Sequence, residues 1–443
     1  MAVAGFPSIL VLIGQIGFIR DQFERPDKVF NTMPVSKNML FYVFLLALVL
    51  PGTAYTSGFK VDQQGAKALG MANAYAVTAD DPSAVYFNPA GLAGQRDPAI
   101  YLGAFALAPS TEFRDPFGAD EEIDELFLAP HFYLAYPYRN ISFGIGIYAP
   151  FGLGMNWSET GLTRYQATEG EIDTLNVNPT IAMRIRHWFL VGAGVDYMRS
   201  TATLEKMVDQ SLVGGTDARS SLEGDGYGWG YNAGVIIIPD ERFRFGVSYR
   251  SAIDIDFNGS ASLDNIAPAV QPLFGGASFR TNARTSIEFP ATLMLGVAYK
   301  ASEKTALELN FEKTYWSSYK SLDIDLENEV APAGFTDTSE PKDWRDIWAV
   351  RAGVEYRAAE RISLRGGYVF QNNPVPDHTL EPRLPDSDQH NISLGIGYNA
   401  ANLVIDAAYM FAYFEDRKVE NSILSGEYST SGHSAGLSIG YKF

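Results

Sequence analysis

The stretch WAVRAGVEY, from Trp348 to Tyr356, decides the fold because its residues alternate strictly between two kinds. Every second residue is apolar or aromatic, and the residues between them are Ala349, Arg351, Gly353 and Glu355. An alternation with a period of two is typical of a β-strand whose two faces meet different surroundings.

The same alternation recurs through the chain, which is therefore predicted to be all-β. We count fourteen segments, near residues 98–110, 126–139, 140–151, 172–187, 189–204, 226–239, 241–257, 281–300, 303–320, 346–357, 360–371, 389–398, 401–416 and 430–443. Six tight turns alternate with long polar loops, and these turns lie at 139–140, 187–188, 239–240, 301–302, 358–359 and 399–400. Short turns at one rim and long loops at the other are typical of an outer-membrane barrel. The sequence thus predicts a 14-stranded antiparallel transmembrane β-barrel whose apolar faces point outward to lipid.

The last strand supports the same location. It ends on Phe443, and alternate residues before it are apolar back to Ala435. A terminal strand with an aromatic last residue resembles the closing strand that outer-membrane barrels present to the barrel assembly machinery. We therefore expect a monomer in the outer membrane of a Gram-negative-type bacterium, in contact with lipopolysaccharide and outer-membrane lipid.

Composition excludes several functions. The chain has 443 residues, a net charge of −18 and no cysteine. The acid excess argues against binding of nucleic acid, whose phosphates attract a Lys/Arg surface. Without cysteine there are no disulfides, thiolate metal sites or cysteine nucleophiles. The five histidines lack the spacing of metal ligands or catalytic residues. We therefore expect no enzymatic activity, no bound metal and no cofactor.

The N-terminal residues 1–54 read as a processing region. Met39–Leu50 is an apolar block that follows Lys37 and precedes small residues up to Ala54, as in a secretory signal peptide. Cleavage is expected after Ala54, and translation is expected to start at Met33 or Met39. A transmembrane anchor is the alternative interpretation of the apolar block.

Residues 55–97 lack strand alternation and are rich in Gly and Ala. Fourteen strands should enclose a lumen, because barrels of about 16–18 strands leave an aqueous channel. We expect residues 55–97 to form a hatch (plug) inside the lumen of a barrel formed by residues 98–443. A mobile periplasmic extension is the alternative.

Prolines point to a weak place in the barrel wall. Proline cannot donate to a strand ladder and normally lies at edges or bulges. Pro130, Pro150 and Pro179 fall in three consecutive predicted strands, the second, third and fourth, and Pro290 falls in the eighth. We expect a locally unpaired ladder around the third strand, facing lipid; ordinary bulging is the alternative.

Two groups of motifs resemble the FadL-like outer-membrane transporters of long-chain fatty acids and aromatic hydrocarbons. The first group lies in the predicted hatch and comprises Ser57-Gly58-Phe59, Ala68-Leu69-Gly70, Ala79-Asp80-Asp81 and Asn88-Pro89-Ala90. The second comprises Ala149-Pro150-Phe151-Gly152-Leu153, Arg164-Tyr165 and Asn176-Val177-Asn178-Pro179-Thr180.

This resemblance implies passive, ligand-gated uptake of hydrophobic molecules, which bind near the extracellular loops, enter a lumenal pocket and leave sideways through the wall. The implied gating residues are Asn88, Pro89 and Ala90 beside the gap, and Pro150, Phe151, Gly152 and Leu153 at the inward kink of the third strand. A general porin and a structural or adhesive barrel remain alternatives.

The cargo is left open between fatty acids and aromatic hydrocarbons. Arg351 and Arg365 face inward and could contact a ligand carboxylate, although pairing with Glu355 and its neighbours explains them equally. The acidic run from Asp120 to Glu125 could bind a cation, and a solvated loop is the alternative.

Overall fold

The structure is a computed structural model that describes residues 58–443. The predicted signal peptide, its cleavage site, the translation start and the first three residues of the predicted hatch lie outside these residues. Within residues 58–443, no helix combines the length and apolar character that a membrane crossing requires.

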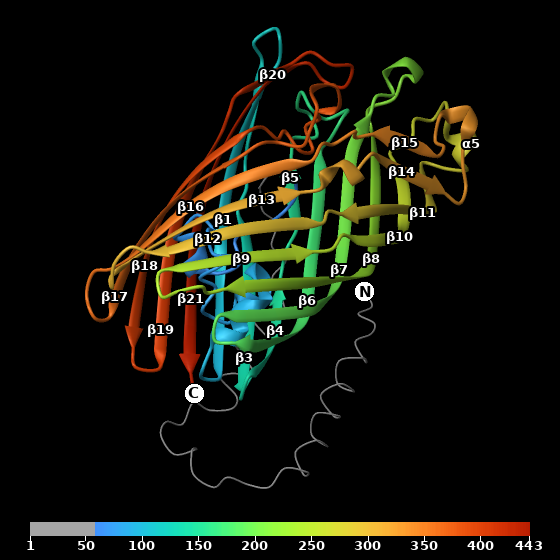
Figure 1. Ribbon diagram of the computed structural model, residues 1–443. Helices are drawn as coiled ribbons and strands as arrows, with labels where there is room; N and C mark the ends of the chain where they lie inside the picture. The colour runs from blue at the N-terminus through green and yellow to red at the C-terminus, as the bar shows by residue number, and fades with distance from the viewer. Residues whose placement is uncertain (1–57) are drawn as a thin grey trace, which may run out of the picture. The chain divides into compact units, whose positions relative to one another are not determined.

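Fourteen antiparallel strands close into a barrel, as the alternation predicted (Figure 1). The first and last strands pair from Ala99↔Lys442 to Arg114↔Glu427, which closes the ring. In ring order the strands are β1 (Ala99–Arg114), β3 (Phe127–Tyr138), β4 (Ile141–Tyr148) with β5 (Gly152–Asn156), β6 (Glu169–Arg186), β7 (Phe189–Val208), β8 (Ala218–Ile237), β9 (Phe243–Arg250) with β10 (Ile253–Asp264), β11 (Ser278–Phe289) with β12 (Thr292–Lys300), β13 (Thr305–Thr314) with β14 (Ser321–Leu326), β16 (Ile347–Arg357), β17 (Ile362–Gln371), β18 (Gln389–Ala400), β19 (Leu403–Phe414) and β21 (Gly426–Lys442).

The apolar face of the strands points out of the ring. Trp348 and Tyr356 of β16 are 42% and 45% exposed, whereas Ala349 and Arg351 on the other face are each 2% exposed. Exposed apolar side chains around a closed ladder suit a lipid environment, which cannot satisfy backbone polar groups. We therefore assign the short turns to the periplasmic rim and the long loops to the extracellular rim.

Two predicted segments are divided in the structure, the seventh between β9 and β10 and the eighth between β11 and β12. Two others stop early, the third at a break over residues 149–151 and the ninth after β13, and β5 and β14 continue these strands beyond the predicted bounds. Pro150 and Pro290 lie in two of these breaks, where a residue without an N–H interrupts the ladder. Strands β10 and β11 also extend into the predicted loop 258–280, because they continue the wall as a hairpin.

Residues 58–97, which we call the hatch segment, pack against inward faces on different sides of the ring. A Cβ atom on Gly192 of β7 would collide with Pro89, and one on Gly367 of β17 would collide with Met71. The segment is almost entirely buried (Figure 1, blue). It contains α3 (Ala66–Leu69), α4 (Ala84–Phe87) and η2 (Pro89–Gly94).

The extracellular loops also fold inward. Between β17 and β18, residues 372–388 are buried or half-buried apart from Asp377 and His378. Short elements occur in the loops: β2 (Asp120–Asp124), η3 (Ser211–Val213), α5 (Gln271–Phe274), η4 (Trp316–Ser318), η5 (Ala331–Ala333), β15 (Thr338–Pro341), η6 (Asp377–Thr379) and β20 (Arg417–Val419).

Candidate functional site

The barrel ladder is interrupted on one side of strand three, which consists of β4, the break at 149–151 and β5. Its pairing with β3 starts at Tyr138↔Ile141 and stops at Phe132↔Ile147. Residues 127–131 of β3 pair with β1, and within the described part of the chain β5 pairs only with β6. The predicted unpaired ladder at strand three is therefore confirmed, and Pro130 lies on the unpaired edge.

The hatch segment supplies hydrogen bonds that strand three would otherwise lack. The Val61 N–H donates to the Pro150 carbonyl, and the Gly152 N–H donates to the Phe59 carbonyl, both at 2.8 Å. Gln64 Nε2 donates to the Ala149 carbonyl at 2.6 Å. This bridge makes a short antiparallel contact between the hatch segment and the wall, so the backbone at the break stays satisfied away from water.

A β-bulge fixes the break on its other side. The pairing with β6 passes from Tyr148↔Asn176 to Gly152↔Asp173, so three residues of strand three face two residues of β6. The Phe151 N–H donates to Thr174 Oγ1 at 3.1 Å, and the Thr174 hydroxyl donates back to the Phe151 carbonyl. An extra residue bends a strand and re-aims its side chains, and here the bend holds strand three beside the hatch segment.

A buried aromatic cluster surrounds this bridge. The Phe59 ring lies 4.6 Å from Trp316, 5.6 Å from Phe289 and 5.6 Å from Trp344, measured between ring centroids. The Phe151 ring lies 4.9 Å from Phe289. An apolar molecule that entered this cluster would therefore press on the same residues that connect the hatch segment to strand three.

An apolar groove opens at the extracellular end of β7, β8, β10 and β14. Its cavity is about 260 Å³ and its apolar lining includes Leu204, Leu222, Leu263, Phe274 and Phe335. A smaller pocket of about 40 Å³ shares Leu204 and Leu222 with it and reaches Phe257, which belongs to the same apolar core as Phe59. The groove and the pocket therefore share lining residues, and the pocket shares an apolar core with the aromatic cluster around Phe59.

Lys206 also lines this groove. Its ammonium makes no hydrogen bond or ion pair of 4 Å or less with any residue among 58–443. Arg383, which also lines the groove, is paired with Glu340 at 3.0 Å and Glu381 at 2.8 Å. Lys206 is thus the cation of the groove that is available to a negatively charged group.

Arg351 lies in a buried ionic cluster that ties the hatch segment to β13 and β16. Its guanidinium is 2.6 Å from Asp62 and 3.3 Å from Glu312, and Lys60 contacts both carboxylates. Burial opposes ionisation of Asp62, but Arg351 and Lys60 lower its pKa to about 2. The two cations and two carboxylates therefore balance one another.

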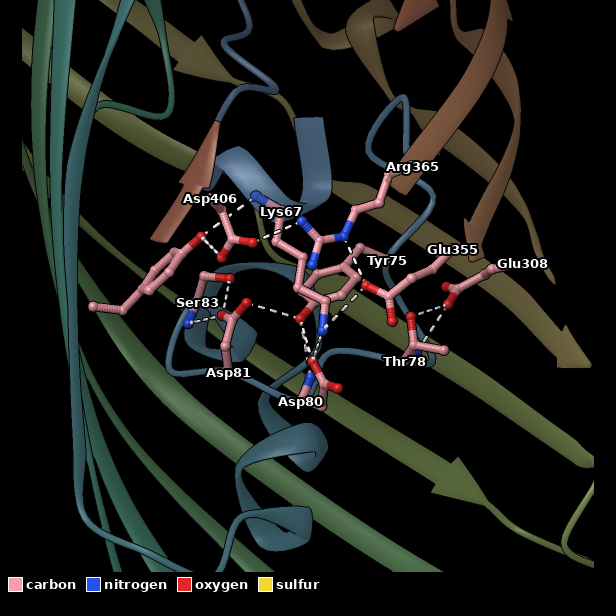
Figure 2. Close-up of polar contacts among 11 residues, drawn as sticks. Lys67, Tyr75, Thr78, Asp80, Asp81, Ser83, Glu308, Glu355, Arg365 and Asp406 are labelled. Carbon is pink, nitrogen blue, oxygen red and sulfur yellow. Dashed lines mark hydrogen bonds and ion pairs between the residues drawn. The ribbon is translucent and has the colours of Figure 1, made fainter. Parts of the chain in front are cut away.

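Arg365 is paired in the same way nearer the periplasmic rim. It donates to Glu355 at 2.7 Å and to Asp406 at 2.6 Å (Figure 2). Both arginines named as candidates for a ligand carboxylate are thus engaged by two carboxylates each. Their contact with a ligand stays a prediction, and it would require displacement of these partners.

Asn88, Pro89 and Ala90 do not lie beside the interruption, so that expectation is wrong. Asn88 Oδ1 accepts from the Ala90 N–H at 3.1 Å and caps η2. Side chains at Gly234 of β8 and Gly192 of β7 would collide with Asn88 and Pro89 respectively. Because these wall positions carry no side chain, the turn packs directly on β7 and β8, on the far side of β6 from strand three. Whether these residues act in gating stays a prediction.

A second polar contact fixes the hatch segment near the periplasmic rim (Figure 2). Lys67 Nζ and the Tyr75 hydroxyl each donate to Asp80 at 2.6 Å. Asp80 itself is exposed at this rim, and its ion pair with Lys67, inside the hatch segment, lowers its pKa to about 2. Glu308 of β13 accepts from the backbone N–H of Val77 at 2.8 Å and of Thr78 at 2.9 Å.

The Asp62 carboxylate predicts how attachment of the hatch segment depends on pH, because its partner Arg351 belongs to the barrel wall. Its pKa is lowered from 3.8 to about 2, so it stabilises the attached state above pH 3.8. That stabilisation is lost as the pH falls from about 4 towards 2, when the carboxylate becomes protonated. We expect ion conductance in planar bilayers to stay low down to about pH 4 and to rise reversibly below it. A rise between pH 6 and 8 would contradict this assignment.

Several of these functional residues could not be assigned a role from the sequence. Phe59 stands in a motif of the family resemblance that carried no assigned function, and Lys60 lies in a segment without periodicity. Lys206 falls between two predicted strands, and Thr174 lies within one. The one usable signal was the proline series, which located the break but not the chain that bridges it.

Comparisons with known proteins agree with this architecture. A family model described as "Outer membrane protein transport protein (OMPP1/FadL/TodX)" matches residues 47–443. The "47 kDa outer membrane protein" of Pasteurella multocida is 25% identical over 92% of this chain and 100% of its own length. The "Long-chain fatty acid transport protein" of Escherichia coli K12 is 22% identical over 85% of this chain and 93% of its own length.

Solved structures show the same fold. A Pseudomonas aeruginosa FadL homologue superimposes with a TM-score of 0.79 at 21% identity, covering 87% of this chain and all of that chain. The P. putida toluene transporter TodX superimposes with a TM-score of 0.68 at 18% identity, covering 82% of this chain and 94% of that chain.

Proposed function

This chain belongs to the OMPP1/FadL/TodX family of outer-membrane transport proteins, and from that membership we propose how it passes hydrophobic compounds across the wall. It is an outer-membrane transporter of hydrophobic compounds and not an enzyme. In our proposal a ligand moves from the extracellular groove into the aromatic cluster, displaces the start of the hatch segment, and leaves sideways into the bilayer at strand three.

The observation that carries this proposal is the exchange of partners at strand three. Where β3 stops pairing, Phe59 and Val61 of the hatch segment take over as hydrogen-bond partners. Each such bond contributes only about 1 kcal/mol net, so a ligand that packs against Phe59 can compete with the bridge. Loss of the bridge would leave strand three without a hydrogen-bond partner on this side, next to the edge of β3 that is already unpaired.

Lateral release also fits the energetics of the cargo. Leu128 and Leu134 on the outer face of β3 are 39% and 36% exposed, so the surface beside the interruption is apolar. An apolar solute gains about 0.8 kcal/mol for each CH₂ group kept out of water, so release into lipid is favoured over release into the periplasm. A disulfide that fixes the bridge closed tests this route, because transport should stop when the disulfide forms.

The lumen argues against a general porin. The hatch segment and residues 372–388 both fill the interior with buried residues. A polar-solute channel would instead need a continuous water-filled path. No feature of residues 58–443 specifically favours an adhesive role.

The groove fits a long apolar molecule with one negatively charged end. Its lining is more apolar than polar, and among residues 58–443 the ammonium of Lys206 has no hydrogen-bond or ion-pair partner within 4 Å. The two carboxylates of the lining are paired elsewhere, Glu340 with Arg383 and Glu205 with Arg219. A carboxylate would gain a charge-assisted hydrogen bond there, whereas an uncharged aromatic hydrocarbon would gain none. The substrate class that we propose is therefore a long-chain fatty acid.

Replacing Lys206 tests this substrate class. We expect Lys206→Ala to lower uptake of oleate roughly fivefold or more, because a charge-assisted hydrogen bond contributes about 1.5–3 kcal/mol. Toluene uptake should stay near the wild-type level. Both would be measured in cells whose own hydrophobic-compound transporters are deleted, with Lys418→Ala as the control for loss of an exposed cation at the extracellular rim. Equal losses for both compounds would contradict the assignment of a carboxylate to Lys206.

A further inference from the structure

Strand two has a long edge that strand three does not cover. β2 pairs with β1 from Ser110↔Asp124 onward, and β3 pairs with β1 from Leu107↔Phe127 onward. The two pairings share one register along β1. β2 and β3 are therefore one strand of the wall, interrupted at residues 125–126. Only Phe132–Tyr138 of it pairs with strand three, so residues 120–131 form a free edge on that side.

Glu121 connects this free edge to the far end of strand three. Its carboxylate accepts from the backbone N–H of Ser158 at 3.0 Å, of Leu162 at 2.7 Å and of Thr163 at 3.3 Å. The Thr163 hydroxyl donates to it at 3.4 Å. A Cβ atom on Gly161 would collide with the same carboxylate, so the loop passes directly over it.

The two edges are thus held at both ends. At the periplasmic end they are held by the last ladder pair, Phe132↔Ile147. At the extracellular end one carboxylate, that of Glu121, gathers the loop that follows β5. Between these points the described residues contain no ladder pair that joins strand two to strand three.

We propose that Glu121 is a positioning residue that sets the separation of the two unpaired edges, and thereby the size of molecule that passes between them. This inference rests on the lateral route proposed above. Hydrogen bonds to an ionised acceptor are roughly twice as strong as neutral ones, and several converge here on one side chain. Asp120, Glu122 and Asp124 of the acidic run are exposed, whereas Glu121 and Glu125 are half-buried on the other face. Of these two, Glu121 is the one that fastens the loop.

The first test measures geometry without transport. Because the chain has no cysteine, nitroxide labels on Leu126→Cys and Asn156→Cys report specifically on the two edges in the purified full-length protein. We expect the label-to-label distance to lengthen and its distribution to broaden in Glu121→Ala. Glu121→Gln should show a smaller change, because an amide oxygen still accepts hydrogen bonds, and Asp124→Ala should show none. An unchanged distribution in Glu121→Ala overturns the proposal.

The second test measures selectivity. We expect Glu121→Ala to raise the ratio of uptake of a pyrene-labelled fatty acid to uptake of oleate by roughly threefold or more, since steric discrimination is a difference between two barriers. A ratio equal to that of Asp124→Ala overturns the role in selectivity. Heat-modified migration on gels identifies any variant that fails to fold, and Glu121→Gln then serves as the test variant.

Failure of the lateral route gives a different result. If transport continued with the bridge between the hatch segment and strand three locked by a disulfide, the proposed route would be wrong. Longer label distances in Glu121→Ala would still show that this carboxylate holds the edges together. The two conclusions are therefore tested separately.

Discussion

Oxidation of a Lys60→Cys/Phe151→Cys double variant should abolish uptake of hydrophobic compounds, and reduction should restore it. These two residues face each other in the antiparallel bridge between the hatch segment and strand three. A disulfide between them would prevent the hatch segment from leaving strand three. If ligands must break this bridge to leave sideways, we expect uptake to fall by about tenfold or more, because a covalent bond removes the displaced state altogether.

The position suits a disulfide. The hydrogen bonds between Gly152 and Phe59 and between Val61 and Pro150 flank the pair, which makes it a non-hydrogen-bonded pair of an antiparallel ladder. Such pairs have Cα atoms about 4.5 Å apart, and disulfides accept about 4.4–6.8 Å. The chain contains no other cysteine, so only this disulfide can form within one molecule.

The controls distinguish the effect of the disulfide from the effect of losing the native side chains. Each single variant and the reduced double variant report the cost of losing the native side chains, in particular the loss of Lys60 from its ion pairs. Labelling of free thiols after denaturation gives the fraction oxidised. Full uptake by a completely oxidised double variant would show that ligands do not pass by way of this bridge.

Arg351→Met should loosen the hatch segment and raise ion conductance strongly. The change leaves two buried carboxylates, Asp62 and Glu312, to share the single cation Lys60. Breaking a buried pair by removal of one partner costs about 3–5 kcal/mol, because the remaining charge is uncompensated. We expect single-molecule conductance in planar bilayers to increase, and the temperature of the heat-modified transition on gels to fall.

A charge-balanced variant provides the matched control. Arg351→Met/Asp62→Asn removes one cation and one carboxylate and leaves the Lys60–Glu312 pair intact. We expect this double variant to recover most of the closed state. The difference in conductance and in transition temperature between the single and double variants reports the coupling between Arg351 and Asp62. An Arg351→Met protein as closed and as heat-resistant as the wild type would contradict the assigned role of this cluster.

Much of the barrel could be predicted from the sequence because its two faces meet different solvents. The alternation around Trp348 reports lipid on one side and a packed lumen on the other, and that contrast repeats in every strand. Prolines added a local signal, since Pro130 and Pro150 are tolerated where no ladder partner is present. The break in strand three was therefore predictable within a few residues.

The contacts of the hatch segment were not predictable in the same way. A segment without periodicity gives no indication of which wall it meets, so Asn88 was expected beside strand three and instead lies on β7 and β8. For the same reason the alternation placed Arg351 on the inner face but could not identify Asp62, 289 residues away in sequence, as its partner. The role of Phe59 depends on a backbone bond to Gly152, which no side-chain pattern records.

The bridge at strand three has a consequence for biogenesis. Until Phe59 and Val61 reach it, the Pro150 carbonyl and the Gly152 N–H lack these partners, although Thr174 already bonds Phe151. The wall at this point therefore gains its full set of backbone hydrogen bonds only when residues 59–61 lie inside the barrel, so we expect completion of the third strand to be coupled to placement of the N-terminal residues.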